Sequence, residues 1–169
     1  EITTGKKDIV IAIIDDGFDL SHEELNKNIV KPYNVLSQND NIYANEKLDH
    51  GTHVAGLAIA KKNNNKGVCG IAPDCSFMPI QMGHNNSIGF STSSIIDGIL
   101  YAINNGADVI NLSIHTMYGE EEKNISEYML KESLKNNSRD DEFFFNELFE
   151  IANDSNITIV FCAGNCEVL

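Results

Sequence analysis

At 169 residues the chain is long enough to form one domain with a sizeable hydrophobic core. Twelve basic residues against 25 acidic ones give a formal net charge of −13, so we expect no nucleic-acid partner, because its phosphates would be repelled over most of the surface. No apolar run approaches the roughly 18 residues needed to cross a bilayer, so we expect no membrane partner either.

The chain begins with a predicted strand followed by turns. Residues 8–14 form a nearly continuous apolar run rich in β-branched side chains, which predicts a strand buried on both faces, as in a parallel sheet. The run ends at Asp15-Asp16-Gly17, where α/β folds place their ligands and where a plain turn is the alternative. Ser21 followed by Glu24 predicts the start of a short helix, Val30 to Val35 a brief strand, and Ser37 to Glu46 an exposed loop.

The stretch from Leu48 to Ala60 predicts a helix that opens with a histidine. Its small and apolar residues recur at helical spacing, and His50 falls on the first turn. Gly51 and Gly56 interrupt the pattern, and close packing against another backbone or a substrate is the usual reason for such glycines. A general base is best held at the exposed end of a rigid element. The alternative is a helix whose polar first turn happens to contain histidines.

The rest of the chain alternates predicted strands and helices. Serines at 91–94 are candidate N-caps for the helix at 95–103, and Asn104-Asn105-Gly106 is a typical helix end. The expected elements are loops at 61–67 and 82–89, strands at Ser76 to Gln81, Asp108 to Ile114 and Ile157 to Cys162, and two helical pieces within 124–154, broken near 136–138. This alternation predicts an α/β fold of three layers: a mostly parallel, twisted sheet with helices on both faces.

The four cysteines lack the C-x-x-C spacing typical of zinc sites. We expect Cys69, Cys75, Cys162 and Cys166 to be buried free thiols, with a disulfide as the alternative. No signal peptide is visible after Glu1. Neither the cysteines nor the search for a targeting segment therefore decides the localisation.

Polar side chains follow several of the predicted strands. Asp15, Ser113 and Asn165 each come after a strand, and the carboxyl ends of parallel strands share one edge of a sheet. His50 opens a helix beside them. A buried carboxylate can orient an imidazole, the imidazole can take a hydroxyl proton, and an amide can donate to an oxyanion. These residue types therefore favour acyl-transfer chemistry.

Three motifs give the chain a family resemblance. Residues 9–17 (I-V-I-A-I-I-D-D-G), 50–56 (H-G-T-H-V-A-G) and 161–165 (F-C-A-G-N) resemble the N-terminal motifs of the subtilisin-like serine peptidases. The segments 67–73 (G-V-C-G-I-A-P) and 107–113 (A-D-V-I-N-L-S) match the same family in order and spacing. The resemblance implies a subtilisin-like fold, a serine endopeptidase activity that proceeds through an acyl-enzyme, and a peptide or protein substrate.

The resemblance also assigns roles to individual residues. It makes Asp15 the orienting acid, His50 the general base and Asn165 the oxyanion donor. It makes His53 structural and puts Asp16 at a variable position, outside the triad. Ser113, Ile114 and His115 correspond to the strand that lines the substrate cleft; His115 stands where the family usually has a glycine that opens the pocket.

The family's nucleophile lies in a G-T-S-M-A-type motif downstream of A-G-N, and no G-T-S occurs in this chain. We therefore expect residues 1–169 to be a partial domain, truncated on its C-terminal side and inactive alone, with an acidic insertion around 116–150. Expected partners are the remaining part of the domain or a pro-segment, and a free sheet edge favours self-association.

Other functions stay open. A pseudopeptidase that acts as a binding or regulatory module is favoured by His115 and by the missing serine, whereas Asp15, His50 and Asn165 argue against it. A nucleotide-binding domain would need a glycine-rich loop after residues 8–14, and only Gly17 is present there.

Calcium is the one cofactor that the resemblance suggests, near the loop after the histidine helix. Candidate ligands are Glu24, Asn64, Asn65 and the carbonyl of Gly67. Calcium takes six to eight oxygen ligands, so these residues alone would not complete its shell.

Overall fold

The structure is a computed structural model, and it describes residues 3–83, 90–114 and 139–163. All strand pairings in its five-stranded sheet are parallel, in the order β2-β3-β1-β4-β5. The strands are β1 (Val10–Asp15), β2 (Tyr33–Asn34), β3 (Ser76–Gln81), β4 (Val109–Leu112) and β5 (Thr158–Phe161). The strand predicted at residues 8–14 is β1, and it lies in the middle of the sheet.

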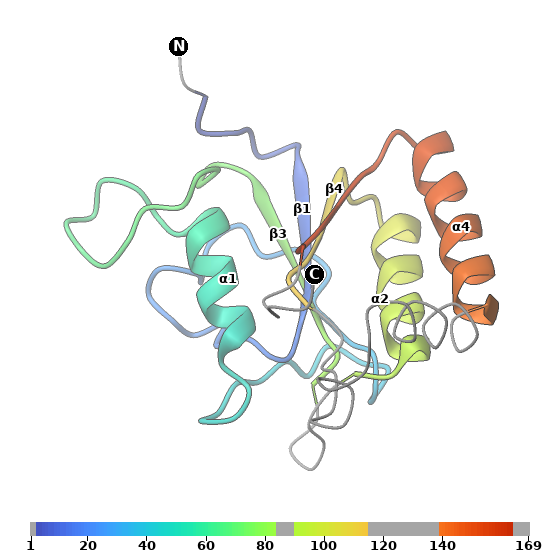
Figure 1. The fold of residues 1–169 in the computed structure, drawn as a ribbon. Coiled ribbons are helices and arrows are strands. Elements are labelled where there is room, and N and C mark those ends of the chain that lie inside the picture. The colour runs from blue at the N-terminus through green and yellow to red at the C-terminus, as the bar shows by residue number, and fades with distance from the viewer. Residues whose placement is uncertain (1–2, 84–89, 115–138, 164–169) are drawn as a thin grey trace, which may run out of the picture.

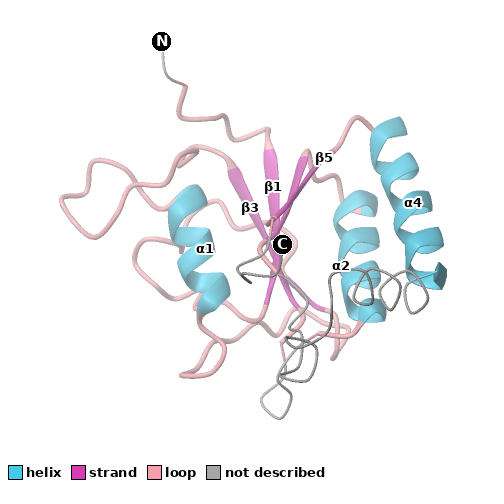
Figure 2. Cartoon of the chain, viewed as in Figure 1, coloured by secondary structure: helices cyan, strands magenta, loops and turns pink. Residues whose placement is uncertain are grey.

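Helices cover both faces of the sheet. Helix α1 (His50–Ile59) lies on one face, and α2 (Thr92–Asn104) and α4 (Arg139–Asp154) lie side by side on the other, as Figures 1 and 2 show. Alternate residues of β1 enter different cores: Ile13 packs in the cluster under α1, and Ile14 packs in the cluster under α2. This two-sided burial explains the continuous apolar run and confirms the predicted three-layer α/β fold.

The register brings the carboxyl ends of the strands to one edge. Asp15 of β1 is level with Gln81 of β3, and Ile14 is level with Leu112 of β4. Leu112 in turn pairs with Phe161 of β5. The residues after these strands therefore start from the same edge, which is where ligands bind in open α/β sheets.

Two predicted elements differ in the structure. Residues 21–24 form turns rather than a helix start: the Ser21 hydroxyl donates to Asp19 Oδ1, and the backbone bonds from His22 N–H to the Asp19 carbonyl and from Leu25 N–H to the His22 carbonyl do not continue into a helix. The expected strand at Val30 to Val35 shrinks to β2, since Lys31 has a φ of 45° and Pro32 has no N–H for a strand ladder.

The prediction for α2 is confirmed at both ends. The Ser91 hydroxyl accepts a hydrogen bond from Ser94 N–H at 3.1 Å, as an N-cap does, and Gly106 has a φ of 81° after the helix. Helix α4 corresponds to the second predicted piece within 124–154, and the rest of that stretch lies outside the described residues.

The cysteines only partly match expectation. Cys75 is a buried free thiol, but Cys69 and Cys162 are exposed, because they lie in segments that leave α1 and β5. Cys166 lies outside the described residues.

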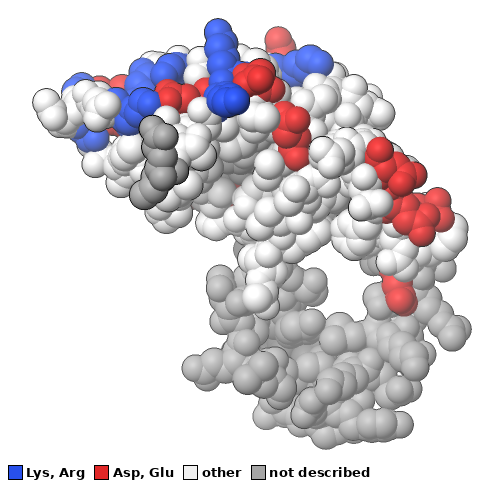
Figure 3. Space-filling model, turned by 90° about the horizontal axis from the view of Figure 1, so that it is seen from above, with Lys and Arg blue, Asp and Glu red and all other residues white. Residues whose placement is uncertain are grey.

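Charged side chains are unevenly placed. Figure 3 shows lysines interleaved with carboxylates over one part of the surface. Ion pairs among the described residues join Lys27 and Lys62 to Asp74 and Lys66 to Glu23. Other parts of this view carry only acidic groups. Among the described residues, no helix has the length and apolar character to cross a membrane.

Candidate active site

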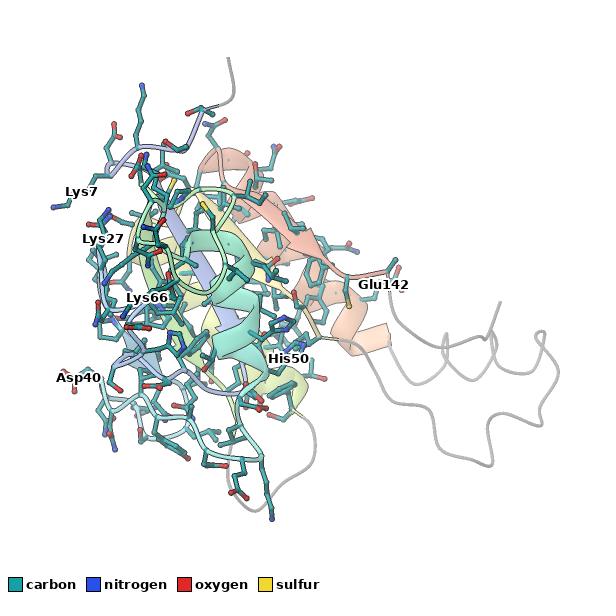
Figure 4. All side chains as sticks on the ribbon, turned by 90° about the vertical axis from the view of Figure 1, so that its left-hand side faces the viewer. Lys7, Lys27, Asp40, His50, Lys66 and Glu142 are labelled. Atoms are coloured by element: carbon teal, nitrogen blue, oxygen red, sulfur yellow. The ribbon has the colours of Figure 1, made fainter. Side chains whose placement is uncertain are left out.

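The first pair of site residues joins the end of β1 to the start of α1. His50 Nδ1 lies 2.8 Å from Asp15 Oδ1. The Asp15 side chain is 1% exposed, whereas that of His50 is 54% exposed. An ionised carboxylate can only accept a hydrogen bond, so Nδ1 carries a proton, and in the neutral imidazole Nε2 keeps its lone pair. Figure 4 shows His50 at the start of α1, away from the labelled lysines.

Burial and charge set the ionisation of this pair. Burial raises the pKa of the Asp15 carboxyl from 3.8 to about 6, although hydrogen bonds from His50 and from the Asp16 N–H lower it. Among the described residues Asp15 Oδ2 finds no hydrogen-bond partner. Partial burial lowers the pKa of His50, but the hydrogen bond and negative charge of Asp15, with the charges of Asp16 and Asp49, raise it above its usual value overall.

Gly51 lets the helix start press against the strand end. A Cβ atom at this position would lie 2.5 Å from the Gly17 carbonyl oxygen and 2.8 Å from Asp15 Cβ, so no side chain fits. The expected reason for this glycine, close packing against another backbone, is confirmed. Gly56 has no such contact among the described residues, because the nearest atom to a Cβ there would be Val68 Cγ2 at 3.9 Å.

Asp16 is the site residue that sequence reasoning missed. Its Oδ1 accepts hydrogen bonds from Gly51 N–H at 2.8 Å and Gly17 N–H at 2.6 Å, and its Oδ2 accepts from His50 N–H at 3.2 Å. The carboxylate therefore caps α1 from a different element. The sequence instead suggests Asp49 as the cap, because it stands at the N-cap position of the helix, but its side chain makes no capping hydrogen bond.

The remaining predicted site residues are only partly described. Ser113 and Ile114 follow β4 at the same edge as Asp15, both half-buried, and Ser113 Oγ accepts from Asn111 Nδ2 at 2.9 Å. His115 and Asn165 lie outside the described residues. The structure thus brings Asp15 and His50 into contact, and the expected oxyanion donor and pocket residue stay predictions.

The calcium candidates gather around a buried carboxylate. Glu24 is 4% exposed, and both of its oxygens accept from Asn64 Nδ2, at 2.9 and 3.0 Å. Asn64 Oδ1 is turned away to accept from Lys66 N–H at 3.3 Å. Gly67 adjoins Glu24, whereas Asn65 is exposed. As arranged, Asn64 presents its amide N–H group to the Glu24 carboxylate, and the calcium site stays a prediction.

Two further features of the described residues bear on ligands. A pocket of about 900 Å³ beside α1 is lined by Asp49, His53 and Gly56 among others, but neither Asp15 nor His50 lines it. No group of three or more His, Cys, Asp and Glu side chains converges in the described ranges in a way that could hold a metal ion.

Sequence comparison finds relatives among bacterial proteinases. The profile of the subtilase family matches residues 6–168. A thermophilic serine proteinase of Bacillus sp. (strain AK1) is 40% identical over 115 residues, which cover 68% of this chain and 28% of that protein. Thermitase of Thermoactinomyces vulgaris is 38% identical over 104 residues, which cover 62% of this chain and 36% of that protein. The chain therefore spans about a third or less of the length of these relatives.

Solved structures agree on the fold. A protease of Pseudoalteromonas arctica PAMC 21717 superposes with a TM-score of 0.70 at 27% identity and covers 97% of this chain and 51% of its own. Fervidolysin of Fervidobacterium pennivorans, described as a keratinolytic enzyme related to subtilisin, gives a TM-score of 0.62 at 25% identity and covers 94% of this chain and 22% of its own.

Proposed function

The chain belongs to the subtilase family, and from that premise we propose that it carries the acid and base of a serine endopeptidase. The contact between the buried Asp15 carboxylate and the half-exposed His50 imidazole, at 2.8 Å, carries the proposal. A carboxylate that accepts from Nδ1 holds the imidazole in the tautomer whose Nε2 can take a proton.

In the proposed reaction His50 acts twice. Its Nε2 takes the proton of a serine hydroxyl as the oxygen attacks the carbonyl carbon of the scissile peptide, and the same proton then passes to the leaving amine. Asp15 stays ionised and stabilises the imidazolium that forms between these steps. Asn165 is proposed to donate its side-chain amide N–H to the oxyanion. Water then hydrolyses the acyl-enzyme with His50 again as base.

The nucleophile has to come from a serine that residues 1–169 do not present in the family motif. We propose that a further segment of the same domain supplies it and that the 169-residue chain alone does not hydrolyse peptides. An acid and a base without a nucleophile leave only residual rate effects.

The test uses the polypeptide encoded by the complete open reading frame. We expect it to cleave a fluorogenic peptide library and to be labelled by a fluorophosphonate probe, which reacts with an activated serine. His50→Gln should remove both signals. His53→Gln is the matched control: this exposed histidine lies one turn further along α1, and its replacement should leave both signals in place.

Two outcomes would contradict the proposal. If the full polypeptide folds but is neither labelled nor active, the pseudopeptidase alternative is supported instead. If the 169-residue chain alone reacts strongly with the probe, a nucleophile lies within it, and the division of roles proposed above is wrong.

A further inference from the structure

We propose that Asp16 is a positioning residue for His50, because its carboxylate caps the N-terminus of α1 and holds the backbone from which the imidazole projects. The inference rests on the proposed function in that it treats His50 as the base. It assigns a role to a residue that the family resemblance leaves outside the triad.

Helix α1 needs an external partner at its start. The first N–H groups of a helix have no acceptor within the helix, and an N-cap side chain usually supplies one. Here the N-cap residue Asp49 makes no such bond, and the first turn contains no acidic residue. Asp16 accepts from the N–H groups of both His50 and Gly51 instead, at 3.2 and 2.8 Å. The cap therefore acts directly on the residue proposed as base.

The carboxylate of Asp16 is itself held firmly. Gly17 N–H donates to Asp16 Oδ1 at 2.6 Å. The backbone of Asp16 is held as well, because Gly83 N–H, just beyond β3, donates to the backbone carbonyl oxygen of Asp16 at 2.9 Å. Because Asp16 is bonded both to residues next to the strand ends and to the first turn of α1, it fixes the start of the helix relative to the sheet. The absence of a side chain at Gly51, where a Cβ would lie 2.5 Å from the Gly17 oxygen, permits this close approach.

Two neighbouring carboxylates thus hold His50 at two different points. Asp15 binds the imidazole through Nδ1, and Asp16 binds the backbone N–H of the same residue. Held only by Asp15, the ring could move together with a loose helix end. Held also by Asp16, the ring has a fixed direction relative to the edge of the sheet, which is what a general base requires.

The experiment compares two variants at position 16 with matched variants at position 49. Asp16→Ala removes the cap and the charge, whereas Asp16→Asn removes the charge but keeps one acceptor oxygen. Asp49→Ala and Asp49→Asn remove a carboxylate that adjoins His50 in the sequence but accepts no capping bond. NMR on the labelled chain measures amide hydrogen exchange at His50 and Gly51, the pKa of the His50 imidazole, and the downfield proton signal of its bond to Asp15.

We expect Asp16→Ala to speed exchange at both amides by about tenfold, as loss of a helix cap would, and to weaken the downfield signal. Asp16→Asn should give a smaller change in exchange, and both position-49 variants none. Among the described residues, the charges of Asp15, Asp16 and Asp49 raise the pKa of His50, so both asparagine variants should lower it. Equal exchange in the position-16 and position-49 variants would overturn the proposal; if Asp16→Ala fails to fold, the two asparagine variants decide. None of these readouts needs hydrolysis, so they separate this inference from the failure of the proposed peptidase activity.

Discussion

Replacing Asp15 by asparagine should change how the stability of the fold depends on pH. The Asp15 carboxyl is buried, and burial raises its pKa from 3.8 to about 6. The folded state therefore binds this proton more tightly than the unfolded state does. The corresponding stabilisation is fully present below about pH 4 and is lost as the pH rises through about 6.

The magnitude follows from the two pKa values. The difference between 3.8 and about 6, at about 1.4 kcal/mol for each pH unit, corresponds to about 3 kcal/mol of unfolding free energy. Asparagine has no charge to bury, so it does not lose this stability as the pH rises. Its amide nitrogen would replace an oxygen that has no hydrogen-bond partner among the described residues, which costs about 1 to 3 kcal/mol at every pH.

Denaturant unfolding of parent and variant from about pH 4 to about pH 8 measures the difference. We expect Asp15→Asn to be less stable than the parent at about pH 4. As the pH rises to about 8, the unfolding free energy of the variant should increase relative to that of the parent by about 3 kcal/mol. Asp40→Asn is the control, because Asp40 is exposed and should give a difference that stays flat with pH. A flat difference for Asp15→Asn as well would refute the link between burial and the raised pKa.

Three further predictions address packing, calcium and self-association. Gly51→Ala should destabilise the chain by more than about 1 kcal/mol, because its Cβ would lie 2.5 Å from the Gly17 oxygen, whereas Gly56→Ala has open space and should be neutral or stabilising by about 1 kcal/mol in the same assay. Calcium at about 1 mM should leave the Tm of the chain unchanged; a rise that Glu24→Gln abolishes would instead establish the site that the resemblance implies. The chain should self-associate through β5, because β5 is an edge strand of the described sheet and its Phe161 is 44% exposed. Light scattering should detect this association, and Phe161→Lys should reduce it. A monodisperse monomer in the parent would contradict the prediction.

The fold was predictable where a segment carries its own signal. The apolar run before Asp15 and the stretch Ser76 to Gln81 became β1 and β3, two of the three inner strands, because two-sided burial demands such runs. The predicted strand at Val30 to Val35 was mostly wrong for a backbone reason: Lys31 has a φ of 45°, and propensity does not reveal a left-handed residue that only tertiary contacts impose.

The site was predictable only in part. The motifs and the shared strand edge pointed to Asp15 and His50, and the structure places them in contact. The cap from Asp16 could not be predicted, because the two residues that it joins are 34 positions apart and Asp49 offered the expected local cap. Capping rules are written for neighbours along the chain, and they fail where another element supplies the acceptor.

The two carboxylates at the end of β1 should therefore affect stability in opposite directions. At neutral pH the ionised Asp15 lowers the free energy of unfolding, because its charge is buried. The half-buried Asp16 raises the free energy of unfolding by satisfying the N–H groups of α1, by about 1 kcal/mol if it acts as helix caps usually do. A stability measurement alone would thus make Asp16 look like the important residue of the pair. The pKa of His50 corrects this impression, because the hydrogen bond and charge of Asp15 are the largest influences that raise it, with Asp16 acting more weakly.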